Sequence, residues 1–455
     1  MAGRDTETVA NSTSANKPRS AALRTVTLGC KVNQYETEYV RQGLLTAGYR
    51  DAEGEEAADL CVVNTCTVTA EGDAKSRQTI RRLARRNPAA RIVVMGCYAT
   101  RAPEDVAELP GVVEVIRDKR ELPDLLGRSG VVDVPDGISH FGHRHRAYVK
   151  VQDGCLLRCS FCIIPQVRPG LESRAPESIV DEIRRLVAHG HREVVLTGIH
   201  LGHYGVDRNR GKPKSEWVRL AGLLSHLMQL DGEFRVRLSS IEATEVTHEL
   251  LEVMAAHPRR ICPHLHISMQ SGSDAVLRRM RRRWGARRFI DRCRLAQQML
   301  DRPALTTDVI VGFPGETEAD FLETCRGVEE LEFSKVHVFP FSPRRGTPAA
   351  EMSDQVNPHI KADRARRLSE LATQTRSRYF RLLAGMQLDV LIERYDPSTS
   401  RAEGTACRYA PVLVSDADRA DESMHAGALV PIVAGPLQGD CIQAAACDHP
   451  SLRSS

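Results

Sequence analysis

Cys155, Cys159 and Cys162 stand close together in the run Cys-Leu-Leu-Arg-Cys-Ser-Phe-Cys. Three thiolates in one loop can ligate three irons of a [4Fe–4S] cluster, which leaves the fourth iron without a protein ligand. Such an open iron can bind and activate a small molecule. The alternative is a zinc site, for which His143 or His145 would supply a fourth ligand. The spacing favours the iron–sulfur cluster, because zinc sites usually show paired Cys-x2-Cys or Cys/His motifs.

Three further cysteines each follow a short apolar stretch that we expect to be a strand. The expected strands are Leu23–Leu28, Leu60–Val63 and Ile92–Met95, and the cysteines that follow them are Cys30, Cys66 and Cys97. Helical patterns at Glu36–Ala47 and Ala74–Arg86 separate the strands, which predicts an open parallel α/β sheet. Ligands bind beyond the carboxyl ends of such strands, so the three thiols would converge. Ordinary buried cysteines are an equally open alternative at this point.

The elements that position these cysteines fall into several domains, as expected for 455 residues. We expect a disordered tail over 1–20, the N-terminal α/β domain over 21–133 and a third domain over 374–445. Six strand–helix units within 141–372 predict a partial parallel (β/α)6 barrel with its chemistry in the loops at the carboxyl ends of the strands. Short β-branched stretches in the last segment predict a small antiparallel barrel.

Composition indicates a cytoplasmic protein without a membrane anchor. The thirteen cysteines are odd in number, no apolar signal sequence precedes them, and no stretch reaches the roughly 18 apolar residues of a membrane span. Thiols in the reducing cytoplasm stay available to metal. The net charge is only +4, so local clusters of charge matter more than the total.

Two dense groups of basic residues point to RNA. The first group lies on an expected helix and comprises Lys75, Arg77, Arg81, Arg82, Arg85 and Arg86; the second comprises Arg278, Arg279, Arg281, Arg282, Arg283, Arg287 and Arg288. Like charges at i,i+4 spacing destabilise a helix, so a polyanionic partner is a reasonable explanation for them. The alternative is a solvated charged face.

These motifs together resemble the radical S-adenosylmethionine (SAM) methylthiotransferases, and the resemblance covers the chain from about residue 23. The segments that carry it are Thr27–Glu38, Asn64–Thr69, Gly96–Ala99 and the loop from Cys155 to Cys162. The resemblance implies that the open iron of the Cys155 loop chelates SAM, which is cleaved to a 5′-deoxyadenosyl radical. It also implies an auxiliary [4Fe–4S] cluster on Cys30, Cys66 and Cys97, and a C-terminal TRAM domain that binds RNA.

Residues after successive barrel strands are candidates for SAM contacts by the same resemblance. They are Phe161 beside the adenine, Gly198 at the SAM amino group, Ser239 and Glu242 at the ribose or carboxylate, and Gln270 and Gly312 in the next two loops. Loop packing and simple turns are the alternatives. Gln166 and Pro169 depart from the Ile-Ile-Pro-Tyr-Ala-Arg-Gly that often follows the third cysteine in the family.

The form Gly29-Cys-Lys-Val-Asn-Gln34 resembles the branch that acts on N6-threonylcarbamoyladenosine (t6A) at position 37 of tRNA. The resemblance therefore implies 2-methylthio-t6A as product, the anticodon stem-loop of tRNA as partner, and flavodoxin or ferredoxin as electron donor, with the enzyme a monomer. Isopentenyladenosine or a ribosomal protein are alternative substrates for the same chemistry. A non-enzymatic zinc- and RNA-binding protein is the alternative from a different class.

Overall fold

The computed structural model describes residues 20–142, 144–415 and 424–446. His143 and Cys447 therefore lie outside the described residues, as does the expected tail up to residue 19. The N-terminal part is a parallel sheet of order β2-β1-β3-β4-β5. Its strands are β1 (Ala22–Thr27), β2 (Arg50–Asp51), β3 (Leu60–Thr65), β4 (Arg91–Gly96) and β5 (Val112–Val115). Its helices are α1 (Lys31–Thr46), α2 (Ala70–Arg86), α3 (Cys97–Arg101), α4 (Pro103–Ala107) and α5 (Leu122–Arg128).

The helix α1 begins earlier than the sequence pattern predicts. It starts at Lys31, directly after Cys30, rather than at Glu36. The Asn33 amide donates hydrogen bonds to the carbonyls of Leu28 (2.9 Å) and Thr65 (3.0 Å), which holds the first turn against β3. Asparagine is a poor helix former in isolation, so this tertiary anchoring decides where the helix begins.

The central part is an open barrel built from two sheets. Their orders are β7-β6-β8-β9 and β10-β11-β12-β13, joined by an isolated parallel bridge between Val236 and Ile261. The strands are β6 (Arg146–Gly154), β7 (Leu171–Ser173), β8 (Glu193–Gly198), β9 (Arg235–Leu238), β10 (Ser240–Ile241), β11 (His264–Ile267), β12 (Ala304–Val311) and β13 (Lys335–Pro340). All pairs are parallel except β6 with β7.

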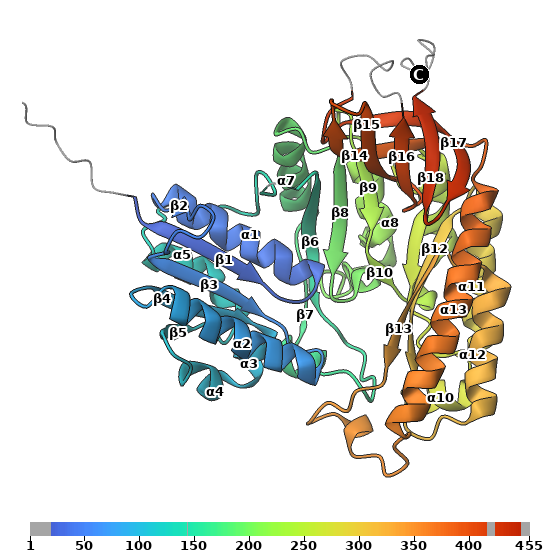
Figure 1. Ribbon diagram of the computed structural model, residues 1–455, viewed down its shortest axis with the longest axis horizontal. Helices are drawn as coiled ribbons and strands as arrows, with labels where there is room; N and C mark the ends of the chain where they lie inside the picture. The colour runs from blue at the N-terminus through green and yellow to red at the C-terminus, as the bar shows by residue number, and fades with distance from the viewer. Residues whose placement is uncertain (1–19, 143, 416–423, 447–455) are drawn as a thin grey trace, which may run out of the picture.

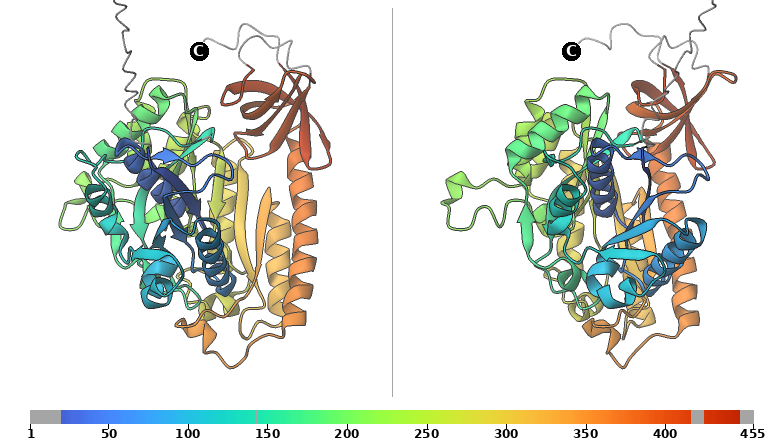
Figure 2. Two further views of the ribbon diagram at one scale, coloured as in Figure 1. Left: turned by 60° about the vertical axis from the view of Figure 1, so that its left-hand side comes forward. Right: turned by 90° about the vertical axis from the view of Figure 1, so that its left-hand side faces the viewer.

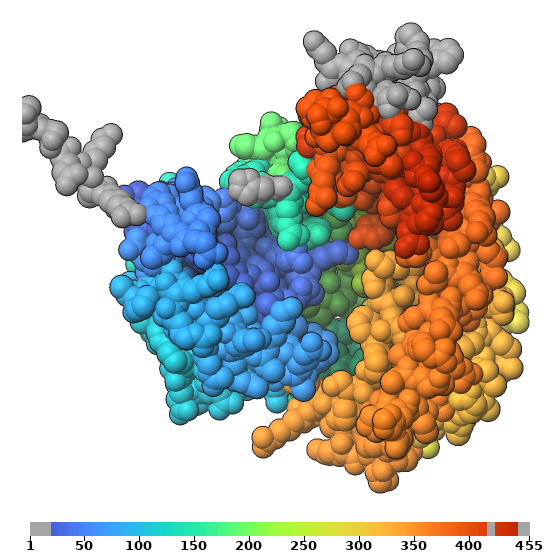
Figure 3. All heavy atoms as spheres, in the orientation of Figure 1, coloured from blue at the N-terminus to red at the C-terminus, as the bar shows by residue number. Residues whose placement is uncertain are grey.

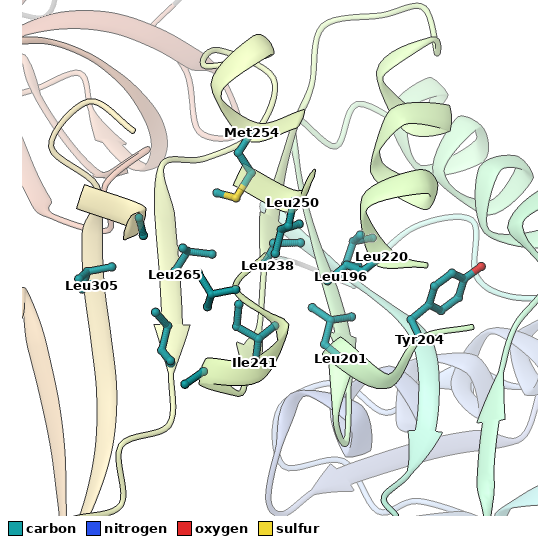
Figure 4. Packing of buried hydrophobic residues seen from close by; sticks show 14 of the residues in the cluster. Leu196, Leu201, Tyr204, Leu220, Leu238, Ile241, Leu250, Met254, Leu265 and Leu305 are labelled. Carbon is teal, nitrogen blue, oxygen red and sulfur yellow. The ribbon is translucent and has the colours of Figure 1, made fainter. Parts of the chain in front are cut away.

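Helices cover the outside of this barrel, and the N-terminal sheet lies across its open side (Figures 1 and 2). The helices are α6 (Ile164–Val167), α7 (Pro176–Ala188), α8 (Leu220–Met228), α9 (His248–Ala256), α10 (Asp274–Arg279), α11 (Ala286–Met299), α12 (Glu318–Leu331) and α13 (Pro358–Leu382). Figure 4 shows the core between strands and helices, where Leu196, Leu238 and Leu265 meet Leu250 and Met254. Burying each such side chain contributes about 2 kcal/mol.

The C-terminal part is a closed five-stranded barrel of order β14-β15-β16-β18-β17. Its strands are β14 (Gln387–Asp396), β15 (Arg401–Ala406), β16 (Pro411–Ser415), β17 (Leu429–Gln438) and β18 (Cys441–Ala446). The pairing is antiparallel except between β16 and β18. The fold class predicted from the sequence is confirmed. The helix α13 runs across the expected boundary at 372–374 and leads into this barrel.

Among the described residues, no helix combines the length and the apolar character that a membrane crossing needs.

Candidate functional site: two sets of three cysteines

The loop with Cys155, Cys159 and Cys162 leaves the carboxyl end of β6 and ends at α6. The amide of Cys162 donates to the carbonyl of Cys159 (3.1 Å), which closes a tight turn between the last two thiols. Ser160, fully buried inside the loop, is held by the carbonyls of Met280 (3.1 Å) and Arg279 (2.8 Å) beyond α10. The loop is therefore fixed by packing against a distant part of the barrel.

Nitrogen donors surround the sulfur atoms of this loop. The Leu157 amide donates to Cys155 Sγ (3.4 Å), and His200 Nδ1 lies 3.5 Å from the same sulfur. Arg282 Nη1 donates to Cys159 Sγ (3.3 Å). Hydrogen bonds to sulfur ligands are one of the means by which a protein tunes the potential of an iron–sulfur cluster.

Burial makes Cys155 and Cys162 poor acids by raising the pKa of each thiol. It raises the pKa of Cys162 to about 12 and raises the pKa of Cys155, with the neighbouring thiols adding to both effects. At neutral pH the thiolates therefore need the positive charge of a metal centre to persist. Three half-buried cysteines on one loop, with N–H donors aimed at two of their sulfurs, fit a [4Fe–4S] cluster with one open iron.

The histidines beside this loop are not those that the zinc alternative named. His200 and His203, from the segment after β8, place ring nitrogens within 4.8 Å of Cys155 Sγ and of each other. Their rings stack with centroids 3.6 Å apart. Burial and the His200 ring lower the pKa of His203 to about 4, so it is neutral at pH 7. His145 is described but belongs to no such group among the described residues.

Gly198 ends β8 next to the cysteine loop. A Cβ at this position would lie 2.7 Å from Gln152 Oε1, so a side chain has no room there. Gln152 in turn accepts from the amide of His200 (2.8 Å) and donates to the carbonyl of Gly154 (2.6 Å). The small residue thus lets Gln152 join the ends of β6 and β8.

Ser239 and Glu242 follow β9 and differ in their surroundings. Ser239 Oγ is buried and has no hydrogen-bond partner among the described residues, which leaves a polar atom for a ligand. Glu242 Oε2 accepts from Trp284 Nε1 (3.2 Å) and pairs closely with Arg282. Arg282 thereby connects the Glu242 carboxylate to the Cys159 sulfur.

Gln270 and Gly312 lie after β11 and β12, and both have positive φ, 63° and 68°. The Gln270 backbone bridges to Asp308 (2.8 Å) and Ile310 (2.9 Å) and extends the sheet. A Cβ at Gly312 would meet Lys361 Cγ at 2.4 Å, so close packing with α13 requires glycine there.

Phe161 is half-buried, and its ring meets that of Phe313 edge-to-face with centroids 6.3 Å apart. The cysteine loop therefore contacts the glycine-containing segment after β12. Arg282, His200 and Gln152 make the other contacts between these loops. Together with the Phe161–Phe313 contact, they show that the loops after β6, β8, β9 and β12 meet at one end of the barrel.

The second set of cysteines gathers at the carboxyl end of the N-terminal sheet. Cys30 precedes α1, Cys66 follows β3, and Cys97 is the first residue of α3. A Cβ at Gly29, whose φ is +101°, would lie 3.1 Å from Cys66 Sγ, so these two segments touch. Burial raises the pKa of both Cys30 and Cys66, and the nearby Cys97 raises both further. The thiols thus lie within electrostatic range of each other.

Motif residues around these cysteines form their support. The Asn64 amide donates to the carbonyl of Asn33 (2.9 Å), and Thr65 Oγ1 donates to that of Met95 (2.7 Å). A Cβ at Gly96, where φ is +98°, would lie 2.4 Å from the Thr65 carbonyl. Glycine before Cys97 is therefore required for β3 and β4 to approach so closely. Three thiols held on a braced sheet edge, of which Cys97 is buried, Cys66 half-buried and Cys30 exposed, fit a cluster with three protein ligands.

The short helix α6 lies between the two cysteine sets. Cys97 packs against Ile163 and Val167, which directly follow the Cys155 loop. Arg168, at the end of α6, is buried and pairs with Glu36 (2.8 Å) and Asp153 (2.7 Å). Its charge lowers the pKa of Cys30, against the larger effect of burial. Figure 3 shows the molecule hollowed between the N-terminal segment (blue) and the orange segment.

The two basic groups differ from expectation in one respect. Most of their side chains are exposed, as a nucleic-acid surface requires, but the side chain of Arg282 is 3% exposed and contacts Cys159 of the cysteine loop. Gln166, at the departure from the family pattern, donates to the Gly346 carbonyl (2.6 Å). Sequence reasoning missed His200, Arg168 and the separate role of Arg282. The signals available in the sequence were a histidine two residues after Gly198 and an arginine at the end of the short helix that follows Cys162.

Comparisons with known proteins agree with this geometry. Residues 22–117 match the family described as "Uncharacterized protein family UPF0004", and residues 149–327 match the Radical SAM superfamily. The chain is 43% identical over 389 residues to the threonylcarbamoyladenosine tRNA methylthiotransferase MtaB of Bacillus subtilis, with 81% of this chain and 84% of that protein covered. It is 39% identical to the MtaB of Thermotoga maritima, covering 82% and 87%.

A relative with a different printed activity also matches. The tRNA-2-methylthio-N(6)-dimethylallyladenosine synthase of Mycolicibacterium paratuberculosis is 37% identical over 407 residues, covering 84% of this chain and 78% of that protein. Among solved structures, the radical SAM methyltransferase TsrM from Kitasatospora setae aligns with a TM-score of 0.50 at 15% identity, over 73% of this chain and 75% of that one. This last likeness concerns the fold alone.

Proposed function

The chain belongs to the tRNA methylthiotransferases of the radical SAM superfamily, and on this premise we propose that its substrate is t6A at position 37 of tRNA. The family carries a [4Fe–4S] cluster and uses SAM. The observation that carries the t6A assignment is the name shared by the relatives that are 43% and 39% identical, against 37% for a dimethylallyladenosine synthase. The segment Gly29–Gln34 supports the same branch.

The reaction would replace the hydrogen on C2 of the adenine by a methylthio group. When bound, the cluster and SAM supply a radical that can attack this aromatic C–H bond, which offers no acidic proton to a base. Cys155, Cys159 and Cys162 would hold the cluster. His200 and Arg282 would orient and tune it through N–H donors, and Ser239 would offer its unpaired hydroxyl to SAM.

We assign Cys30, Cys66 and Cys97 to an auxiliary [4Fe–4S] cluster that takes part in sulfur delivery. The chain's own contribution would be to hold this centre beside the first set, across α6, with Arg168 supplying positive charge next to Cys30. Phe161, Gly198, Glu242, Gln270 and Gly312 would shape the SAM end of the barrel. Flavodoxin or ferredoxin as reductant, a monomeric state and a cytoplasmic location complete the proposal, and free thiols suit a reducing compartment.

Mass spectrometry of tRNA nucleosides tests the substrate assignment. A strain that lacks the gene should contain t6A without its 2-methylthio derivative, and restoring the gene should restore that derivative. As a matched control, the gene with Cys155→Ala should not restore it. Restoration of 2-methylthio-isopentenyladenosine with unchanged t6A would contradict the substrate and keep the reaction class.

A further inference from the structure

A cluster of polar side chains on the inner face of the barrel is not used by either cysteine set. His266 on β11, Asp308 on β12 and His337 on β13 place their ring nitrogens and carboxylate within 4.8 Å of one another. Asp308 is paired in register with His337, and His266 with Thr306. All three side chains are partly exposed, so they are open to a ligand.

The side chains of the cluster contact one another and Thr306, and some of their polar atoms remain available to a ligand. His266 Nδ1 lies 3.0 Å from Thr306 Oγ1, and its Nε2 lies 3.3 Å from Asp308 Oδ2. His266 Nδ1 is thus paired within the protein, whereas Nε2 faces Asp308 and makes no hydrogen bond among the described residues. The cluster offers an acceptor in Asp308 and a ring nitrogen in His337.

Two lysines add positive charge in the neighbourhood of this cluster. Lys335 precedes His337 by two residues on β13, and alternate residues of a strand share a face. Lys31 comes from the first turn of α1, next to Cys30. The charges of Lys335 and Lys31 both act on His337, and Asp308 acts on Lys31. Lys31 and Lys335 carry two positive charges and Asp308 carries one negative charge, so this group of side chains is positively charged overall.

An aromatic ring continues the same strand face. Phe339 is 48% exposed, unusual for a large apolar side chain on a barrel interior, and its ring is stacked on that of His337 with centroids 6.5 Å apart. An exposed ring beside a polar pocket is the arrangement on which an unstacked base rests in RNA-binding proteins.

We propose that Lys31, Asp308, Lys335 and His337 form the subsite for the polar N6 substituent of the target base, with Phe339 stacking on the base. This inference rests on the proposed function. The threonylcarbamoyl group carries a carboxylate, a hydroxyl and carbamoyl N–H groups. The lysines match the carboxylate, and Asp308 matches the N–H donors. An apolar isopentenyl group would leave these charged groups desolvated and unpaired. This cost would lead the enzyme to reject isopentenyladenosine as a substrate.

The test uses the reconstituted enzyme and two anticodon stem-loops that differ only in the threonylcarbamoyl group. Lys335→Gln and His337→Ala are the variants, with Lys214→Gln and His359→Ala, which lie outside β11, β12 and β13, as exposed controls. The measurements are kcat/KM for methylthiolation and the Kd of each stem-loop without turnover. Each subsite variant should lower kcat/KM on the t6A stem-loop about 10- to 100-fold, the loss expected for a hydrogen bond to a charged group. The preference for t6A should shrink accordingly, and the controls should keep it.

The outcomes separate the subsite from the proposed function. If the unaltered enzyme shows no preference for t6A, the proposed function fails and the subsite with it. If it prefers t6A and both variants keep that preference in kcat/KM and Kd, only the subsite is wrong. Stoichiometric binding of zinc that depends on His337 would assign the cluster to a metal and overturn the inference. Lys335 is exposed, so its variant folds even if the His337 variant does not.

Discussion

Glu193→Gln should loosen the C-terminal barrel from the radical SAM barrel. Glu193 is fully buried at the start of β8 and accepts from Arg235 Nε (2.6 Å) and Arg237 Nε (2.8 Å), while Arg146 Nε lies 2.7 Å away. Arg235 and Arg237 reach across the interface to the backbone. Their acceptors are the carbonyls of Asp389, Thr405, Ala406 and Cys407. One carboxylate therefore pairs with both guanidiniums that join the two barrels.

The free-energy cost of each substitution depends on which charged groups it leaves without a partner. Glutamine keeps the size of Glu193 but leaves Arg235 and Arg237 without a carboxylate partner among the described residues, while Arg146 keeps Glu393 (2.8 Å). Removing one partner of a buried ion pair costs about 3–5 kcal/mol, or roughly 100- to 3000-fold in a local opening equilibrium. Arg237→Met removes one cation and leaves Glu193 with two partners, so it should cost less. This ranking of Glu193→Gln and Arg237→Met does not depend on the absolute free energy assigned to either variant.

Hydrogen–deuterium exchange of the holoprotein measures this opening without global unfolding. Peptides from β15 (Arg401–Ala406) should exchange at least about 100-fold faster in Glu193→Gln. The matched control is Asp181→Asn, whose partner Arg184 is 63% exposed, and it should change little. Equal protection in Glu193→Gln and the unaltered protein, or a larger effect of Arg237→Met, would refute the reasoning.

Glu193 and its arginine partners also make the stability of this interface depend on pH. Burial opposes ionisation of Glu193, but Arg235, Arg237 and Arg146 hold its pKa well below the usual 4.5. A carboxyl whose pKa is lowered by folding stabilises the protein above its unfolded pKa, and this contribution is lost as pH falls toward the folded value. Protection of β15, corrected for intrinsic exchange, should therefore decrease below about pH 4.5 in the unaltered protein. Glu193→Gln should lack this component.

Two further predictions concern the cysteines and the RNA surface. Replacing Cys155, Cys159 and Cys162 by Ala should abolish formation of 5′-deoxyadenosine, whereas replacing Cys30, Cys66 and Cys97 should stop methylthiolation and lower the iron content from about eight to about four per chain. Methylthio product from the second triple variant would contradict the auxiliary cluster. Charge reversal of the exposed Arg81 and Arg85 on α2 should weaken tRNA binding and reduce the salt dependence by about 0.9 for each phosphate that is no longer neutralised. An unchanged slope, equal to that of Arg326→Glu on α12, would exclude α2 from the interface.

The extent of prediction from sequence differs between the two cysteine sets. Spacing within one loop is fixed by the covalent chain, so Cys155, Cys159 and Cys162 could be grouped from sequence alone. Cys30, Cys66 and Cys97 were harder, because their convergence depends on strand order. Their placement after successive strands predicted a common sheet edge, and the order β1-β3-β4 brings the three strand ends side by side.

Other features were decided only by the tertiary structure. Seven arginines near residue 280 look equivalent in the sequence, yet Arg282 turns inward because Cys159 and Glu242 offer it partners from distant strands. The group of His266, Asp308 and His337 arises from the register of three parallel strands. Lys31, whose charge acts on His337, is the first residue of α1 because that helix starts early. Local sequence determined the elements and the reactive residue types. Which side chains meet was decided by packing between segments far apart in the chain, since contact energies between such segments depend on the whole fold.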